Sequence, residues 1–251
     1  MTGGCIALDR ILGKLDQYLH RNDYTGAQRH LEYWLQEALA AGDSSTELTV
    51  RNELMGLYRK LGREKPAVEM AQSALARVED LGISRQVGAA TTCLNAATVY
   101  KAFGRAQEAL ALYERAAEIY VQELDPADTR IAGLCNNMAL ALVDLGQFDR
   151  AEALYTKALA VLAQTENNEP EMAITHLNLA SLAEAKLDLE DGWADIEGNL
   201  GKVRELLEGY GKWDGNYAFV CEKCASVYGY YGFTDYANTL AERSRRIYEG
   251  T

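Results

Sequence analysis

Long apolar runs are scarce in this chain of 251 residues. No stretch approaches the roughly 20 apolar residues that a membrane-spanning helix needs, so we expect no membrane segment. The start, MTGGCIALDR, lacks the basic-then-apolar order of a signal peptide. Cys5 follows two glycines, as at a lipoprotein cleavage site, but no apolar segment precedes it. We therefore expect a cytoplasmic protein.

Positive charge is also in short supply, with 25 Lys and Arg against 37 Asp and Glu and a net charge of −12. Nucleic-acid binding needs a basic stripe, so we expect no nucleic-acid partner. The charge favours solubility and suits a basic partner. Acidic excess is concentrated in residues 169–212, either as a solvated outer face or as a docking patch for a cationic segment.

Catalytic and metal-binding signals are missing as well. The three histidines have no metal-ligand or nucleophile partner at a useful spacing, and the sequence has no Gly-rich phosphate loop, G-x-S-x-G or H-E-x-x-H. We therefore expect no enzymatic activity, no cofactor and no metal.

The cysteines include a single C-x-x-C pair, Cys221 and Cys224, where a zinc site needs more ligands. Cys93, Cys135 and Cys221 fall at the same early core position of the first helix in their units, which predicts buried, structural side chains. Metal binding or redox use of the pair is the alternative. Free thiols suit a reducing cytoplasm.

What the sequence does contain is a helix pair, formed most clearly by residues 135–162. Small and apolar residues recur there at helical spacing. Gly146 falls where the first helix must end and the chain reverse, a position that suits a left-handed backbone. Ala139 and Ala151 let the two helices approach closely. Such a pair keeps one apolar side and must stack on a neighbour.

The same pattern recurs along the chain. The positions that define the pattern are Ala139, Gly146, Ala151, Tyr155 and Ala158. The same five residue types occur 42 residues earlier, at Ala97, Gly104, Ala109, Tyr113 and Ala116. The predicted units are residues 6–42, 43–83, 84–126, 127–168, 169–212 and 213–250. An aromatic column at Tyr18, Tyr58, Tyr100 and Tyr228 supports this register. One domain over residues 1–251 is therefore predicted.

This pattern resembles the tetratricopeptide repeat (TPR). Its period of 42 residues, rather than the usual 34, is similar to the repeats of kinesin light chains and many bacterial signalling proteins. The resemblance implies an all-α, right-handed solenoid of about six antiparallel helix pairs that binds a protein or peptide segment in its concave groove. A peptide-sensing regulator that acts through a separate output partner is the alternative. Self-association is left open.

Asparagines form a second column, because Asn95, Asn137 and Asn178 occupy one position in three consecutive units. The resemblance places that position on the concave face. An amide offers both a donor and an acceptor, so the three could clamp the backbone of an extended peptide. They could equally bond neighbouring helices or water. Both interpretations stay open.

Charged residues complete the predicted groove. Arg59 and Lys101 share one repeat position and could take a peptide carboxylate, which would make the N-terminal half of the groove basic. Asp144 and Lys223 belong to the same predicted surface, and a solvated face is the alternative for each. Gly192, Gly198 and Gly201 predict a bend or break in residues 190–210.

Overall fold

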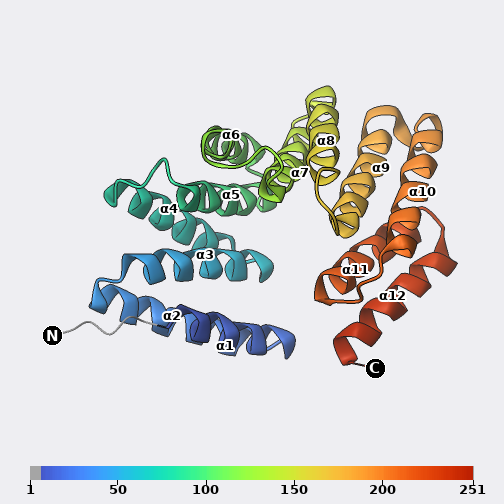
Figure 1. The fold of residues 1–251 in the computed structure, drawn as a ribbon. Coiled ribbons are helices and arrows are strands. Elements are labelled where there is room, and N and C mark those ends of the chain that lie inside the picture. The colour runs from blue at the N-terminus through green and yellow to red at the C-terminus, as the bar shows by residue number, and fades with distance from the viewer. Residues whose placement is uncertain (1–6, 251) are drawn as a thin grey trace. The chain divides into compact units, whose positions relative to one another are not determined.

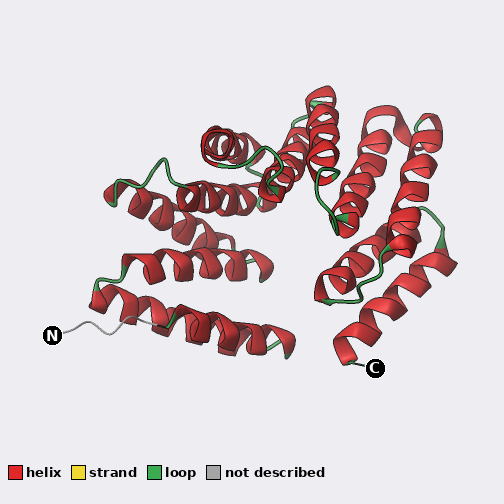
Figure 2. Ribbon diagram, in the orientation of Figure 1, coloured by secondary structure: helices red, strands yellow, loops and turns green. Residues whose placement is uncertain are grey.

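The computed structural model describes residues 7–250 and is all-α over that range (Figures 1 and 2). The twelve helices of these residues form six sequential pairs, which confirms the predicted all-α architecture of about six helix pairs. The pairs are α1 (Leu8–His20) with α2 (Tyr24–Ala41), α3 (Ser44–Lys60) with α4 (Glu64–Asp80), α5 (Val87–Ala102) with α6 (Ala106–Glu123), α7 (Thr129–Asp144) with α8 (Phe148–Leu162), α9 (Glu169–Asp191) with α10 (Trp193–Gly209), and α11 (Gly215–Tyr230) with α12 (Thr234–Glu249).

The helices gather into two compact units, one ending at Leu124 and one beginning at Asp125. We call them the N-terminal unit, which holds α1–α6, and the C-terminal unit, which holds α7–α12. The prediction of one domain over the whole chain remains a prediction.

Glycines with a left-handed backbone close four of the six helix pairs. Gly62, Gly104, Gly146 and Gly232 have φ between 66° and 87°. In each case the next residue donates its backbone N–H to a carbonyl one turn inside the first helix, as Gln147 does to Leu142 at 2.9 Å. A residue with a Cβ is disfavoured at such φ values, so the glycines fix where each first helix ends.

Small residues then set how closely the two helices of a pair approach. Ala139, Ala151 and Ala158 are fully buried between α7 and α8 around Tyr155, which is also fully buried. The predicted equivalents in α5 and α6 are buried in the same way. The aromatic column is buried at Tyr58, Tyr100 and Tyr228. These positions carry the core of each pair, as the sequence pattern predicts.

The α9–α10 pair closes differently. α9 has a non-helical residue, Asp188, with φ 65° and ψ −179°, and its carboxylate Oδ1 accepts backbone N–H groups of Glu190 and Asp191 at 2.9 and 3.1 Å. A Cβ on Gly192 would lie 2.7 Å from the Asp188 carbonyl oxygen and 2.9 Å from that of Ala183. The break predicted for this unit therefore lies at Asp188 to Gly192, whereas Gly198 and Gly201 lie inside an unbroken α10.

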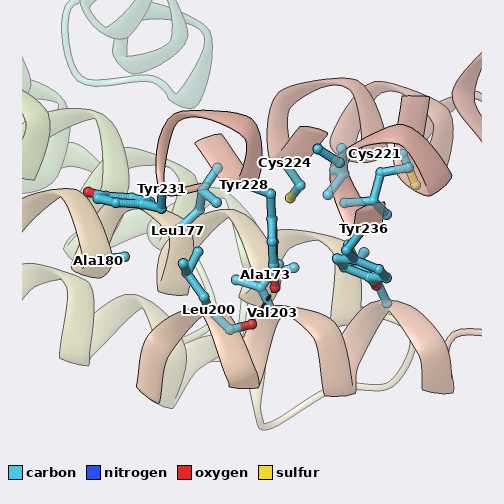
Figure 3. Packing of buried hydrophobic residues seen from close by; sticks show 14 of the residues in the cluster. Ala173, Leu177, Ala180, Leu200, Val203, Cys221, Cys224, Tyr228, Tyr231 and Tyr236 are labelled. Carbon is cyan, nitrogen blue, oxygen red and sulfur yellow. Dashed lines mark hydrogen bonds between the residues drawn. The ribbon is translucent and has the colours of Figure 1, made fainter. Parts of the chain in front are cut away.

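In the C-terminal unit, the apolar residues of α9–α12 form one continuous core (Figure 3). Tyr228 reaches from α11 to donate its hydroxyl hydrogen to the Leu200 carbonyl of α10. Cys221 and Cys224 lie in the same core and are fully buried.

Candidate functional site

The N-terminal unit has a cleft of about 570 Å³ between α3 and α5, the first helices of two successive pairs. Leu48, Leu81 and Ile83 supply its apolar side. Its polar residues are Ser44, Ser45, Thr49, Asn52, Glu53, Gln86, Thr91 and Asn95, and Gly88 also lines it. We call this the α3–α5 cleft.

Asn95, one of the three predicted column asparagines, lies in the cleft and is half-buried. Its Nδ2 donates to Oδ1 of Asn52 across the two helices at 2.9 Å. Asn52 in turn donates to the Leu48 carbonyl at 2.9 Å and to Oγ1 of Thr92 at 3.1 Å. Asn52 has thus used both N–H groups, whereas Asn95 keeps its carbonyl oxygen and one N–H for a ligand.

Glu53 is the single ionisable side chain among the residues that line the cleft. It lies 42 residues before Asn95 and so takes the same repeat position in the preceding pair. Burial raises the pKa of the Glu53 carboxyl, and the charge of Asp16 on α1 raises it further. The lining of this cleft holds a carboxyl group and no Lys or Arg, so the basic groove predicted from Arg59 and Lys101 is not this cleft and stays a prediction.

A hydrogen bond between successive first helices recurs in the C-terminal unit. Asn136 donates from Nδ2 to Oγ1 of Thr175 at 2.9 Å, as Asn52 does to Thr92. Both threonine hydroxyls donate on to a carbonyl one turn earlier, and both threonines are fully buried. Sequence reasoning missed this bridge, although Asn52 and Asn136 lie two periods apart.

The other two column asparagines are in the C-terminal unit, beside this bridge. Asn137 is half-buried, and its Nδ2 donates to the Gly133 carbonyl of its own helix at 3.0 Å. Asn178 is half-buried on α9 and has no side-chain hydrogen bond within residues 7–250. The bond made by Asn95 supports the helix-bridging interpretation for that residue, whereas the amide of Asn178 is available to a ligand.

The predicted charged residues lie outside the α3–α5 cleft. Arg59 is exposed near the end of α3, and Lys101 is half-buried near the end of α5. In the C-terminal unit, Asp144 is exposed on α7 and Lys223 on α11. The Lys223 ammonium lies 5.5 Å from the ring centre of Phe219, which is 48% exposed. A role in peptide binding remains a prediction for all four.

The cysteines behave as buried apolar residues. Cys93, Cys135, Cys221 and Cys224 are free thiols, and burial raises the pKa of each, that of Cys224 to about 12. Thiolates, the reactive and metal-binding form, are therefore disfavoured at neutral pH. In residues 7–250 no group of His, Cys, Asp and Glu is arranged to hold a metal ion. Cys5 lies outside the described residues.

The histidines are also accounted for by contacts with other groups of the protein. A ring nitrogen of His176 lies 2.9 Å from Oδ1 of Asn199, and one of His30 lies 3.0 Å from the Ile11 carbonyl oxygen. The sequence predicted a half-buried, satisfied side chain for His176, and this is confirmed.

Comparison with known proteins identifies the repeat. The sequence profile of the tetratricopeptide repeat matches residues 89–128 and 131–169, which hold the α5–α6 and α7–α8 pairs. The α5–α6 and α7–α8 pairs are therefore tetratricopeptide repeats. Protein KINESIN LIGHT CHAIN-RELATED 1 of Arabidopsis thaliana is 30% identical to it over 141 residues. That match covers 55% of this chain and 23% of the relative, so the chain spans about a quarter of the relative's length.

Solved structures of similar fold extend over nearly the whole chain. BtubC (BKLC) from P. vanneervenii is 22% identical, with a TM-score of 0.57, and the match covers 98% of this chain and 92% of that one. NprR in complex with its cognate peptide NprX is 16% identical, with a TM-score of 0.60, and covers 94% and 66%. At these identities the likeness establishes the fold alone.

Within the described part of the chain, every helix is too short or too polar to cross a bilayer.

Proposed function

We propose that this chain is a scaffold that holds an extended peptide or protein segment against its first helices, with the α3–α5 cleft as the main contact in the N-terminal unit. The observation that carries the proposal is the composition of the cleft. Leu48, Leu81 and Ile83 offer apolar surface beside the incompletely bonded amide of Asn95. Its volume of about 570 Å³ falls within the roughly 300–1,000 Å³ of ligand sites.

The hydrogen bonds and the apolar surface of the cleft are expected to contribute differently to the free energy of binding. Each hydrogen bond from Asn95 contributes about 0.5–1.5 kcal/mol net, whereas micromolar binding requires about −8 kcal/mol. Apolar burial must therefore supply most of the affinity, at about 25 cal/mol per Å². The amide then fixes the position of the bound backbone.

Glu53 gives the cleft a chemical preference. Its carboxyl is costly to ionise where it lies, so a ligand that brings an N–H donor or a cation to it recovers that cost. We expect bound segments to place an apolar side chain on Leu48, Leu81 and Ile83, and a donor group at Glu53.

A peptide-sensing role is the second candidate, favoured by the fold shared with the peptide complex of NprR. In that case the bound segment would change the affinity of this chain for a separate output protein. A cytoplasmic location and the absence of catalytic activity remain predictions from the sequence.

Selection from a random linear peptide library tests the proposal. Gly88 lines the cleft, and a Cβ there would meet no atom within 4 Å, so we expect Gly88→Tyr to place its ring in the cleft. Gly198→Tyr on exposed α10 is the matched control. We expect peptides to be enriched on the wild type and on Gly198→Tyr and to be lost on Gly88→Tyr. Enrichment of the same peptides on all three proteins would contradict the proposal.

A further inference from the structure

Large apolar side chains are exposed at the helix–helix turns of the C-terminal unit. Among residues 7–250, those strongly exposed where the first helix of a pair meets the second are Leu187 (41%), Leu189 (47%), Trp193 (38%) and Tyr230 (68%). The first three flank the irregular α9–α10 turn, and Tyr230 ends α11. With the less exposed Tyr231 and Phe233 they form what we call the turn patch.

Ring contacts join the two turns into one surface. The Trp193 ring stacks on that of Phe233, with centroids 6.2 Å apart and planes 9° apart, and meets Tyr231 edge-on at 6.5 Å. Tyr230 and Tyr231 contact each other at 5.0 Å. Both donate their hydroxyl hydrogens to the Glu184 carboxylate of α9, at 2.6 and 2.7 Å. Figure 3 shows Tyr231 at one end of the buried core, so the patch rests on packed residues.

The backbone between the two leucines is non-helical. Asp188, which separates them, has the positive φ and the two N–H bonds described above. Gly192 allows α10 to start against Ala183. A left-handed backbone at a residue other than glycine is costly and persists where surrounding contacts enforce it. Leu187 and Leu189 thus flank a non-helical residue whose carboxylate accepts two backbone N–H groups.

Most charged residues near the α9–α10 turn are acidic, although Arg204 lines a pocket beside Phe233. Between residues 184 and 197 there are six acidic residues, namely Glu184, Asp188, Glu190, Asp191, Asp195 and Glu197, and one basic residue, Lys186. Lys186 is already bonded to Asp149 at 2.8 Å and to Glu152 at 3.1 Å on α8. The patch therefore combines exposed apolar side chains with a strongly negative rim.

We propose that the turn patch docks a cationic amphipathic helix of a partner protein, with Leu or Phe side chains on one face and Lys or Arg on the other. The apolar side chains would cover Leu187, Leu189 and Trp193, and the basic ones would meet the acidic rim. An anionic membrane surface would be repelled by the same charges. The site belongs to the C-terminal unit and is independent of the α3–α5 cleft, so either can fail alone.

Fluorescence anisotropy with a synthetic probe tests this. The probe is a labelled peptide of about 16 residues, roughly four helical turns, built from Leu and Lys with all Leu on one face. A version with Glu in place of Lys tests the charge. The test variant is Leu187→Gln/Leu189→Gln, and the matched control is Leu39→Gln/Val121→Gln, which changes two exposed apolar residues of the N-terminal unit. Circular dichroism first establishes that both variants are folded.

We expect the Lys peptide to bind the wild type and the control equally, and the Leu187→Gln/Leu189→Gln protein at least about 10-fold more weakly, which corresponds to about 1.4 kcal/mol. Affinity should fall with added salt, since exposed charges are screened. In a Trp34→Phe/Trp213→Phe background the remaining Trp193 should change its emission when the peptide binds.

Several results would overturn the proposal. One is that the Lys peptide does not bind the wild type. Another is that it binds the wild type and Leu187→Gln/Leu189→Gln with equal affinity. The third is that the wild type binds the Glu peptide as tightly as the Lys peptide. Sedimentation of the wild type that shows a dimer, with Leu187→Gln/Leu189→Gln a monomer, would assign the patch to a second copy of this chain instead.

Discussion

The α7–α8 and α9–α10 pairs share their core positions and differ in how the chain turns between helices. Ala139 and Ala180 are both fully buried at equivalent positions, as are Tyr155 and Ile196. The α7–α8 turn uses Gly146 with φ 69°, whereas the α9–α10 turn uses Asp188 with φ 65° and exposes two leucines. Stacking of repeats therefore constrains the core, and the turns are free to acquire other roles.

Gly192 is where the comparison predicts the largest effect. It takes the position of Ala151, yet a Cβ there would meet two backbone carbonyl oxygens at 2.7 and 2.9 Å. Backbone cannot move aside cheaply, so we expect Gly192→Ala to cost about 2–4 kcal/mol. Urea unfolding of the wild type and of Gly192→Ala measures this loss in the free energy of unfolding.

The control for Gly192 lies two turns further along α10. A Cβ on Gly198 meets open space, so Gly198→Ala should stabilise the protein by about 0.5–1 kcal/mol through helix propensity. If both variants shift stability in the same direction, the close approach at Gly192 is not real.

Ala139 should show a smaller effect. It is fully buried between α7 and α8, so Ala139→Leu overpacks the regular pair and should cost about 1–3 kcal/mol. The exposed Ala185 on α9 is the matched position, and Ala185→Leu should stay within about 0.5 kcal/mol of wild type. Similar losses in both variants would show that the core assignment of Ala139 is incorrect.

Neighbouring asparagines provide the next test. Asn136 bridges to buried Thr175, so Asn136→Ala should cost about 1 kcal/mol. Asn137 bonds a carbonyl of its own helix, so Asn137→Ala should change stability by less than about 0.5 kcal/mol. Thermal unfolding of both variants measures the difference. A larger loss for Asn137 would make it the structural residue of the two.

Glu53 should produce the smallest effect, and one that depends on pH. Its pKa is raised in the folded state, so the folded protein binds its proton more tightly than the unfolded chain does. The contribution of Glu53 to the stability of the fold is therefore fully present below pH 4.5, the pKa of the carboxyl in the unfolded chain. It is lost as the pH rises through the higher pKa of the folded state. Glu53→Gln should therefore be more stable than wild type at pH 7, and the difference should vanish at acid pH. A constant difference across pH would contradict the assignment.

Sequence periodicity predicted the six pairs because glycine turns and alanine contacts are local features. The break near Gly192 was predicted for the same reason, but its place at Asp188 depends on contacts with Ala183 that the sequence does not display. The Asn52–Thr92 and Asn136–Thr175 bridges were missed because each joins different repeats. The basic groove was predicted from Arg59 and Lys101, and neither residue lines the α3–α5 cleft. The cleft holds Glu53 instead, at the repeat position that Asn95 takes in the next pair.

The most direct test of the binding function is the affinity of one selected peptide, measured by calorimetry against the wild type, Gly88→Tyr and Gly198→Tyr. Occupation of the α3–α5 cleft predicts a loss of at least about 10-fold for Gly88→Tyr and no change for Gly198→Tyr. Equal affinity for all three proteins would show that the peptide binds elsewhere and would contradict the proposed site.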